Sequence, residues 1–113
     1  MTIFWFTGNS GAGKTPAAKW FRRQEILLDG DELRRVWTDL DLSGAGRREQ
    51  NLRAARLAKL LSDQGFEVIV ATICPYRDLR EEVQRITDCT FIYLPGGRSG
   101  PDYPYELPIE APE

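Results

Sequence analysis

The chain has 113 residues, with 15 basic and 17 acidic side chains, two cysteines and no histidine. This length corresponds to one domain with room for a modest core. The absence of histidine excludes Ser-His-Asp triads and His-ligated metal sites, so any general base has to be a carboxylate. Two cysteines provide neither a disulfide framework nor a metal-ligand set, and no apolar run is long enough to span a bilayer. We therefore expect a cytoplasmic protein that makes no membrane contact.

The N-terminal segment combines an apolar stretch with a glycine-rich loop. Residues 2–7 are predicted to form a strand, and the loop after it fits the pattern G-x-x-x-x-G-K-[ST] at every fixed position. Glycines let such a backbone curl around a polyphosphate so that successive N–H groups point at its oxygens. We expect ATP here, with Lys14 spanning the β- and γ-phosphates and the Thr15 hydroxyl ligating Mg²⁺. The expected ATP-binding residues are Gly8, Asn9, Ser10, Gly11, Ala12, Gly13, Lys14 and Thr15.

Two carboxylates follow the second predicted strand, residues 25–28. Asp29 and Asp31 flank a glycine at the end of this strand, which points both side chains toward the phosphate crevice. One of them can take the proton from an acceptor hydroxyl, and the other can hold Mg²⁺ through water. Asp29, Asp31 and Lys14 are therefore the candidate catalytic residues, and Thr15 and Asp31 the candidate metal ligands. The alternative is a turn in which Asp31 caps the next helix, and both interpretations can hold together.

The rest of the chain alternates helices with short strands, which predicts a three-layer α/β fold with a small parallel sheet covered on both faces. The bulky residues Trp5, Trp20, Trp37 and Phe66 are expected in its core. Residues 1–94 should form this core domain, and the proline-rich residues 95–113 a tail that packs on it. The first expected helix spans residues 13–23, and the second carries Leu33, Val36 and Trp37 on one face. A long helix then ends at Gln64-Gly65, and a last helix spans residues 76–86. The further strands are expected at residues 66–71 and 90–94.

Several arginines stand where a bound anion would stabilise them. Arg34 lies one turn into the helix after the carboxylates. Arg47, Arg48 and Arg53 crowd the start of the long helix, where cations oppose the helix dipole. This placement favours an anion at the carboxyl edge of the sheet, although solvated helix faces are the ordinary alternative.

The chain carries the motifs F-T-G-N-S-G-A-G-K-T at 6–15, L-D-G-D-E-L-R at 28–34, R-E-Q-N-L-R at 48–53, A-K-L-L-S-D-Q-G at 58–65, I-C-P-Y-R-D-L-R at 73–80 and P-Y-E-L-P at 104–108. Taken together, these motifs resemble those of the adenylylsulfate kinases, a family with the P-loop NTPase fold. The resemblance implies that Asp31 is the base or the Mg²⁺ organiser, and that Arg34, Arg48 and Asn51 bind the acceptor. It also implies an acceptor pocket lined by Ile73 and Pro75. Cys74 precedes a proline at a strand end near this site, and from that position we expect it to be a small pocket-lining residue.

The chain also departs from that family. Cys74 stands where the family usually has serine, and the last strand passes through Pro95-Gly96-Gly97 almost directly into the tail. We therefore expect the family's Arg/Lys-rich lid and its closing strand and helix to be missing. Short sequences of this kind resemble bacteriophage proteins, some of which belong with kinases acting on 5-hydroxymethyluracil in DNA. A phage protein would act in the host cytoplasm.

The sequence thus predicts a Mg·ATP-dependent kinase with an alcohol acceptor. The hydroxymethyl group of 5-hydroxymethyluracil in DNA is the favoured acceptor, because a lid would obstruct a duplex or an extruded nucleotide. The net charge of −2 argues against a DNA binder. The alternatives are the ribose 3′-hydroxyl of adenylylsulfate and a nucleotide-binding module without turnover. A homodimer is one assembly compatible with the sequence.

Overall fold

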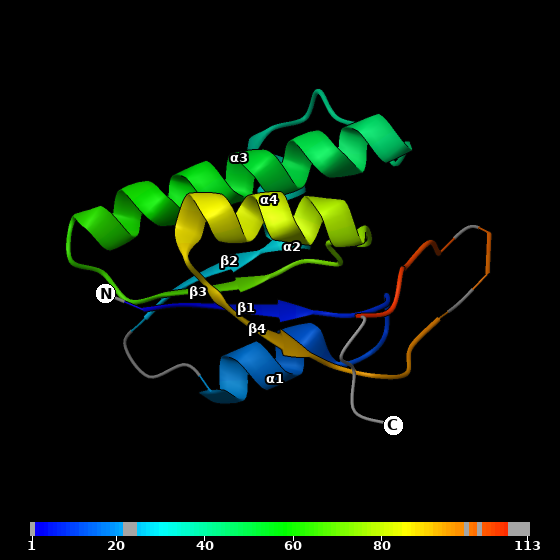
Figure 1. Ribbon diagram of the computed structural model, residues 1–113, viewed down its shortest axis with the longest axis horizontal. Helices are drawn as coiled ribbons and strands as arrows, with labels where there is room; N and C mark the ends of the chain where they lie inside the picture. Colours follow the sequence, from blue (N-terminus) through cyan, green and yellow to red (C-terminus); the bar gives the residue numbers. More distant parts are fainter. Residues whose placement is uncertain (1, 22–24, 99, 102, 109–113) are drawn as a thin grey trace.

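The elements in chain order are β1 (Ile3–Thr7), α1 (Lys14–Phe21), β2 (Ile26–Asp29), α2 (Gly30–Val36), α3 (Gly44–Asp63), β3 (Val68–Ala71), α4 (Arg77–Thr87) and β4 (Thr90–Tyr93). The four strands form a parallel sheet in the order β2-β3-β1-β4, which is the middle layer of the protein. The computed structural model describes residues 2–21, 25–98, 100–101 and 103–108. Helix α1 covers one face of the sheet, α3 and α4 cover the other, and α2 packs beside β2 (Figure 1). This is the predicted three-layer α/β fold.

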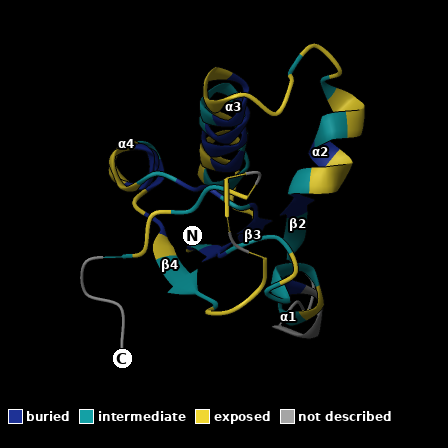
Figure 2. Ribbon diagram, turned by 90° about the vertical axis from the view of Figure 1, so that its right-hand side faces the viewer, coloured by how far each residue is buried: buried dark blue, intermediate teal, exposed yellow. Residues whose placement is uncertain are grey.

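The two faces of the sheet bury separate apolar clusters, because successive strand residues point to opposite sides. Val68 and Val70 of β3 face α3 and α4, while Ile69 and Ala71 face α1. All four residues of β3 are buried, as expected for a central strand covered on both faces. On the α3 side, Trp5 is fully buried and packs in the same cluster as the small residues Ala54, Ala55 and Ala58. Figure 2 shows these buried segments between the helices.

The third strand starts later than predicted, and the core assignment of Phe66 is wrong. Phe66 is 48% exposed, because it belongs to the turn that ends α3 rather than to β3. Its N–H donates to the carbonyl of Leu61, and the N–H of Gly65 donates to Ser62. This is a Schellman ending with Gly65 in the left-handed region, at φ 94°. The end of the predicted helix at Arg23 and the side chain of Trp20 lie outside the described residues.

The segment after β4 returns across the carboxyl ends of the strands (Figure 1). The N–H of Leu94 donates to Thr7, and the N–H of Arg98 donates to Ser10 in the glycine-rich loop at 2.7 Å. Further along, the ring of Tyr105 stacks on Tyr93 with 5.8 Å between centroids. Leu94, Arg98 and Tyr105 therefore lie at the same edge of the sheet to which the functional residues were predicted.

None of the helices in the described part of the chain is long and apolar enough to cross a membrane.

Candidate functional site

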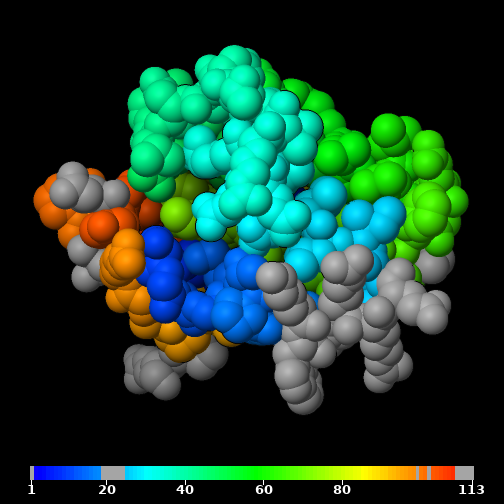
Figure 3. Space-filling model, turned by 180° about the vertical axis from the view of Figure 1, so that it is seen from behind, coloured from blue at the N-terminus to red at the C-terminus, as the bar shows by residue number. Residues whose placement is uncertain are grey.

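A cavity of about 660 Å³ opens at the carboxyl edge of the sheet. Its walls come from the glycine-rich loop, the end of β2, the first turns of α3 and the loop that follows β3, residues 72–76. Tyr103 adds a wall from the returning segment. Figure 3 shows this side of the molecule, where the blue N-terminal segment meets the cyan segment above it and the orange segment beside it. The predicted loop and carboxylates therefore share one cavity with Arg34 and Arg47.

Lys14 is the first residue of α1, and its ammonium lies at the cavity wall. Its Nζ donates to the carbonyl of Asn9 at 2.7 Å, so the loop itself holds the ammonium in place. Burial lowers the pKa of Lys14, and the charges of Asp31 and Asp29 oppose part of this shift. A partly desolvated cation at the start of a helix, beside backbone N–H groups, is suited to polyphosphate.

Asp29, and not Asp31, caps the helix after the second strand. β2 continues through Asp29, which pairs with Ala71, so that α2 starts immediately at Gly30. One carboxylate oxygen of Asp29 accepts from the N–H of Glu32, and the other accepts from the Thr15 hydroxyl at 2.5 Å. Asp31 is exposed and lines the cavity. It remains free of the capping role that the sequence-based alternative gave it.

The oxygens around Thr15 fit a magnesium ion. Hydroxyl and carboxylate oxygens are ligands that Mg²⁺ prefers, and it is commonly held by one or two carboxylates together with substrate phosphates. Thr15, Asp29 and Asp31 all line the same cavity. Within the described residues there is no group of three or more His, Cys, Asp or Glu side chains placed to hold a metal. A metal here would therefore rely on phosphate oxygens as well.

Two guanidinium groups lie across the cavity from the glycine-rich loop. Arg34 and Arg47 both line it. Burial lowers the pKa of Arg34, and the charge of Arg47 lowers it further. Arg47 is only 9% exposed, and its Nε donates to the carbonyl of Leu42 at 2.8 Å. Neighbouring cations in a partly buried wall are stabilised by an anion, so this wall is suited to a negatively charged ligand.

Asn51 lines the cavity, but it also belongs to a buried chain of hydrogen bonds. The indole of Trp5 donates to the Thr72 hydroxyl at 2.9 Å, and this hydroxyl donates to Asn51 Oδ1 at 2.6 Å. Asn51 Nδ2 then donates to the carbonyl of Arg47 at 2.8 Å. These hydrogen bonds join the sheet to the first turns of α3. It therefore positions Arg47 relative to the ends of the strands.

Some predicted residues do not line the cavity. Arg48 forms a bidentate pair with the exposed Asp78 at 2.9 and 3.1 Å and lies over the ring of Tyr76. Cys74 is fully buried in the core, with φ at 45°, so the expectation that it lines the pocket is wrong. Its neighbours Ile73 and Pro75 do line the cavity.

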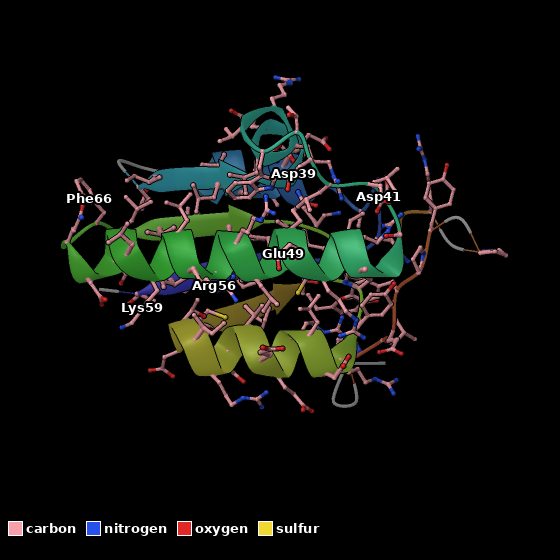
Figure 4. All side chains as sticks on the ribbon, turned by 90° about the horizontal axis from the view of Figure 1, so that it is seen from above. Asp39, Asp41, Glu49, Arg56, Lys59 and Phe66 are labelled. Carbon is pink, nitrogen blue, oxygen red and sulfur yellow. The ribbon has the colours of Figure 1, made fainter. Side chains whose placement is uncertain are left out.

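Arg53 is likewise paired with carboxylates of the protein. Its guanidinium pairs with Asp39 and Glu49. Figure 4 labels Glu49 on α3 and Asp39 on the side of that helix toward α2. The anion expected near it is thus supplied by the protein.

The sequence did not assign Arg47 individually to the acceptor, and it did not predict that Gln50 and Tyr103 line the cavity. The position of Arg47 at the start of the long helix was the available signal, whereas nothing local pointed to Tyr103.

Comparisons with known proteins agree with this geometry. The family model for adenylylsulphate kinase matches residues 1–94. An adenylyl-sulfate kinase of Burkholderia ambifaria is 43% identical over 99 residues, which is 80% of this chain and 55% of that protein. The chain thus spans about half the length of the curated relatives it matches.

Two solved structures are also similar. The Mycobacterium tuberculosis APS kinase CysC in complex with AMPPNP and APS superposes with a TM-score of 0.72 and 34% identity, over 81% of this chain and 60% of that one. A hexameric APS kinase from Thiobacillus denitrificans gives a TM-score of 0.76 and 28% identity, over 98% of this chain and 24% of that one. The fold, the phosphate loop and these matches together place the chain in the adenylylsulphate kinase family.

Proposed function

We propose that the protein is an ATP-dependent kinase that phosphorylates the ribose 3′-hydroxyl of adenylylsulfate. The observation that carries the proposal is one cavity with the phosphate loop on one side and the guanidinium pair Arg34 and Arg47 on the other. Adenylylsulfate is an anion, and so it suits that second wall. The M. tuberculosis relative, whose solved complex holds AMPPNP and APS, supports the same pairing of substrates.

On the donor side, the loop N–H groups and Lys14 bind the β- and γ-phosphates of ATP. Thr15, with Asp29 and Asp31 nearby, would hold Mg²⁺, which when bound neutralises charge on the phosphates. Asp29 keeps the Thr15 hydroxyl at the cavity through their 2.5 Å hydrogen bond. These residues position the γ-phosphoryl group in the cavity.

On the acceptor side, Arg34 and Arg47 bind the anionic part of the acceptor, and Ile73 and Pro75 form an apolar wall. Asp31 takes the proton of the attacking hydroxyl. As that oxygen bonds to the γ-phosphorus, the bond to the β–γ bridging oxygen breaks and ADP leaves. The proton then passes from Asp31 to solvent.

The hydroxymethyluracil acceptor is less well supported. The matched relatives are adenylyl-sulfate kinases, and the net charge of −2 lacks the basic surplus typical of DNA binders. It remains an outcome of the test below, as does binding without turnover. The homodimer and the cytoplasmic location also remain predictions.

The acceptor is tested by offering γ-labelled ATP and Mg²⁺ with adenylylsulfate, with the free hydroxymethyl nucleotide, or with duplex DNA containing hydroxymethyluracil. We expect label in adenylylsulfate and none in the other two. Arg34→Ala should raise the KM for adenylylsulfate, whereas Arg35→Ala, on the exposed side of the same helix, should not. Label in the duplex alone would establish the DNA reaction, and ATP binding without any labelled product would indicate a binding module.

A further inference from the structure

The loop that follows β3 is held by a distant segment of the chain. We name residues 72–76 the acceptor loop and residues 103–107 the strap. We propose that the strap and Arg80 position the acceptor loop and so set the affinity for the acceptor. The identity of that acceptor rests on the proposed function, but the contacts do not.

Three consecutive carbonyls of the acceptor loop are each bound from outside the loop. The Thr7 hydroxyl donates to Ile73 at 2.7 Å, Arg80 Nη1 donates to Cys74 at 2.7 Å, and the N–H of Glu106 donates to Pro75 at 2.7 Å. The Thr7 hydroxyl also shares a 3.0 Å hydrogen bond with the hydroxyl of Tyr105. Every carbonyl in this run is therefore tied directly, or through one hydroxyl, to the strap or to α4.

Arg80 joins the strap to the acceptor loop. It is 7% exposed, and its second Nη donates to the carbonyl of Glu106 while the first binds Cys74. Its guanidinium also lies 4.8 Å from the centroid of the Tyr105 ring. A rigid fork that binds two carbonyls fixes their separation in a way that a lysine ammonium does not.

The acceptor loop needs such external support because its conformation is strained. Cys74 has φ at 45°, a region that non-glycine residues occupy only when their surroundings hold them there. Its neighbours Ile73 and Pro75 line the cavity, as does Tyr103 of the strap. The strained residue thus turns two neighbours toward the site while its own side chain stays in the core.

The strap also caps the helix after the acceptor loop. Tyr76, the N-cap residue of α4, makes no side-chain capping bond. Instead Glu106 Oε1 accepts from the N–H of Arg77 at 2.8 Å, and Arg77 Nε donates to the carbonyl of Leu107 at 2.5 Å. A carboxylate at a helix N-terminus is favourable. Glu106 therefore holds the junction between the acceptor loop and α4 on both sides: its backbone N–H binds Pro75, and its side chain binds Arg77.

The donor half of the cavity is lined by Ser10, Gly11, Gly13, Lys14 and Thr15, none of which takes part in these contacts. Loosening the strap should therefore raise the KM for the acceptor and leave the KM for ATP unchanged. Glu106→Ala, at an exposed position, and Tyr105→Phe, at a half-buried one, test this on the strap, and Arg80→Lys tests the fork. Glu106→Gln keeps an acceptor oxygen for Arg77 and should restore most of the affinity. Arg85→Ala, an exposed change on α4, is the control.

The experiment combines steady-state kinetics with amide hydrogen exchange of residues 73–77. We expect Glu106→Ala to raise the KM for adenylylsulfate on the order of tenfold, the loss of one hydrogen bond to a charged group. Exchange at Cys74, Tyr76 and Arg77 should accelerate in the same variant and remain slow in Arg85→Ala. Unchanged exchange and unchanged KM in Glu106→Ala, Tyr105→Phe and Arg80→Lys would overturn the proposal. If the wild type transfers nothing to adenylylsulfate, the proposed function fails while hydrogen exchange still decides the role of the strap.

Discussion

Lys14 combines a charge that ATP requires with an environment that disfavours that charge. Burial lowers its pKa, and Asp31 and Asp29 only partly oppose the shift. Lys14 therefore loses its proton at a lower pH than a solvent-exposed lysine does. The Kd for ATP should rise as the pH is raised toward that point, and Lys14→Arg should bind more weakly at neutral pH but without this pH dependence. Calorimetric titrations with ATP at increasing pH measure the Kd of the wild type and of Lys14→Arg. A wild-type Kd that stays constant over this range would contradict the role of Lys14 in binding the phosphates.

The two carboxylates at the end of β2 should separate into a structural and a chemical role. Asp29→Ala removes the cap of α2 and should lower the free energy of unfolding by about 0.5–2 kcal/mol. Asp31→Asn keeps the size of an exposed side chain but removes its basicity, so kcat should fall while the melting temperature changes little. Thermal melts and initial rates on both variants decide this. A normal kcat in Asp31→Asn would remove Asp31 from the chemical step.

At the scale of elements, α3 is joined to the sheet by the hydrogen-bond chain through Trp5, Thr72 and Asn51. Thr72→Val leaves a buried indole N–H and a buried amide oxygen without these partners, which should cost about 1–3 kcal/mol of unfolding free energy. Thr90→Val, at an exposed position of β4, is the matched control and should be nearly neutral. Urea denaturation gives both values. Equal stability of the two variants would mean that these hydrogen bonds contribute nothing measurable to the free energy of unfolding.

A second contact at this scale joins the segment after β4 to the phosphate loop. A Cβ on Gly97 would lie 2.7 Å from the carbonyl oxygen of Ser10 and 2.8 Å from the nitrogen of Ala12. Gly97→Ala should therefore displace the loop and weaken ATP binding. Gly96 also has a positive φ but nothing within 4 Å of its Cβ position, so Gly96→Ala carries the backbone strain without the clash. Equal ATP affinity in these two variants would show that the clash has no effect on the loop.

At the scale of the whole molecule, the strands and the phosphate loop follow from local patterns. The apolar run at β3 and the pattern from Gly8 to Thr15 are readable without tertiary information. Pairings between distant residues cannot be read from local sequence. Arg48 binds Asp78 of another helix, and the side chain of Cys74 turns into the core because its carbonyl and those beside it are bound from outside. Those contacts depend on packing, which a motif does not report.

The central claim is that one cavity holds ATP and adenylylsulfate for direct transfer. Its most direct test is the transfer of γ-labelled phosphate from saturating Mg·ATP to adenylylsulfate by the wild-type chain and by Lys14→Ala. We predict labelled product from the wild type and at least about a 10²-fold lower rate from the variant, because a preorganised charge at the migrating phosphoryl group is lost. Equal rates in the two proteins, or no labelled product from the wild type, would contradict it.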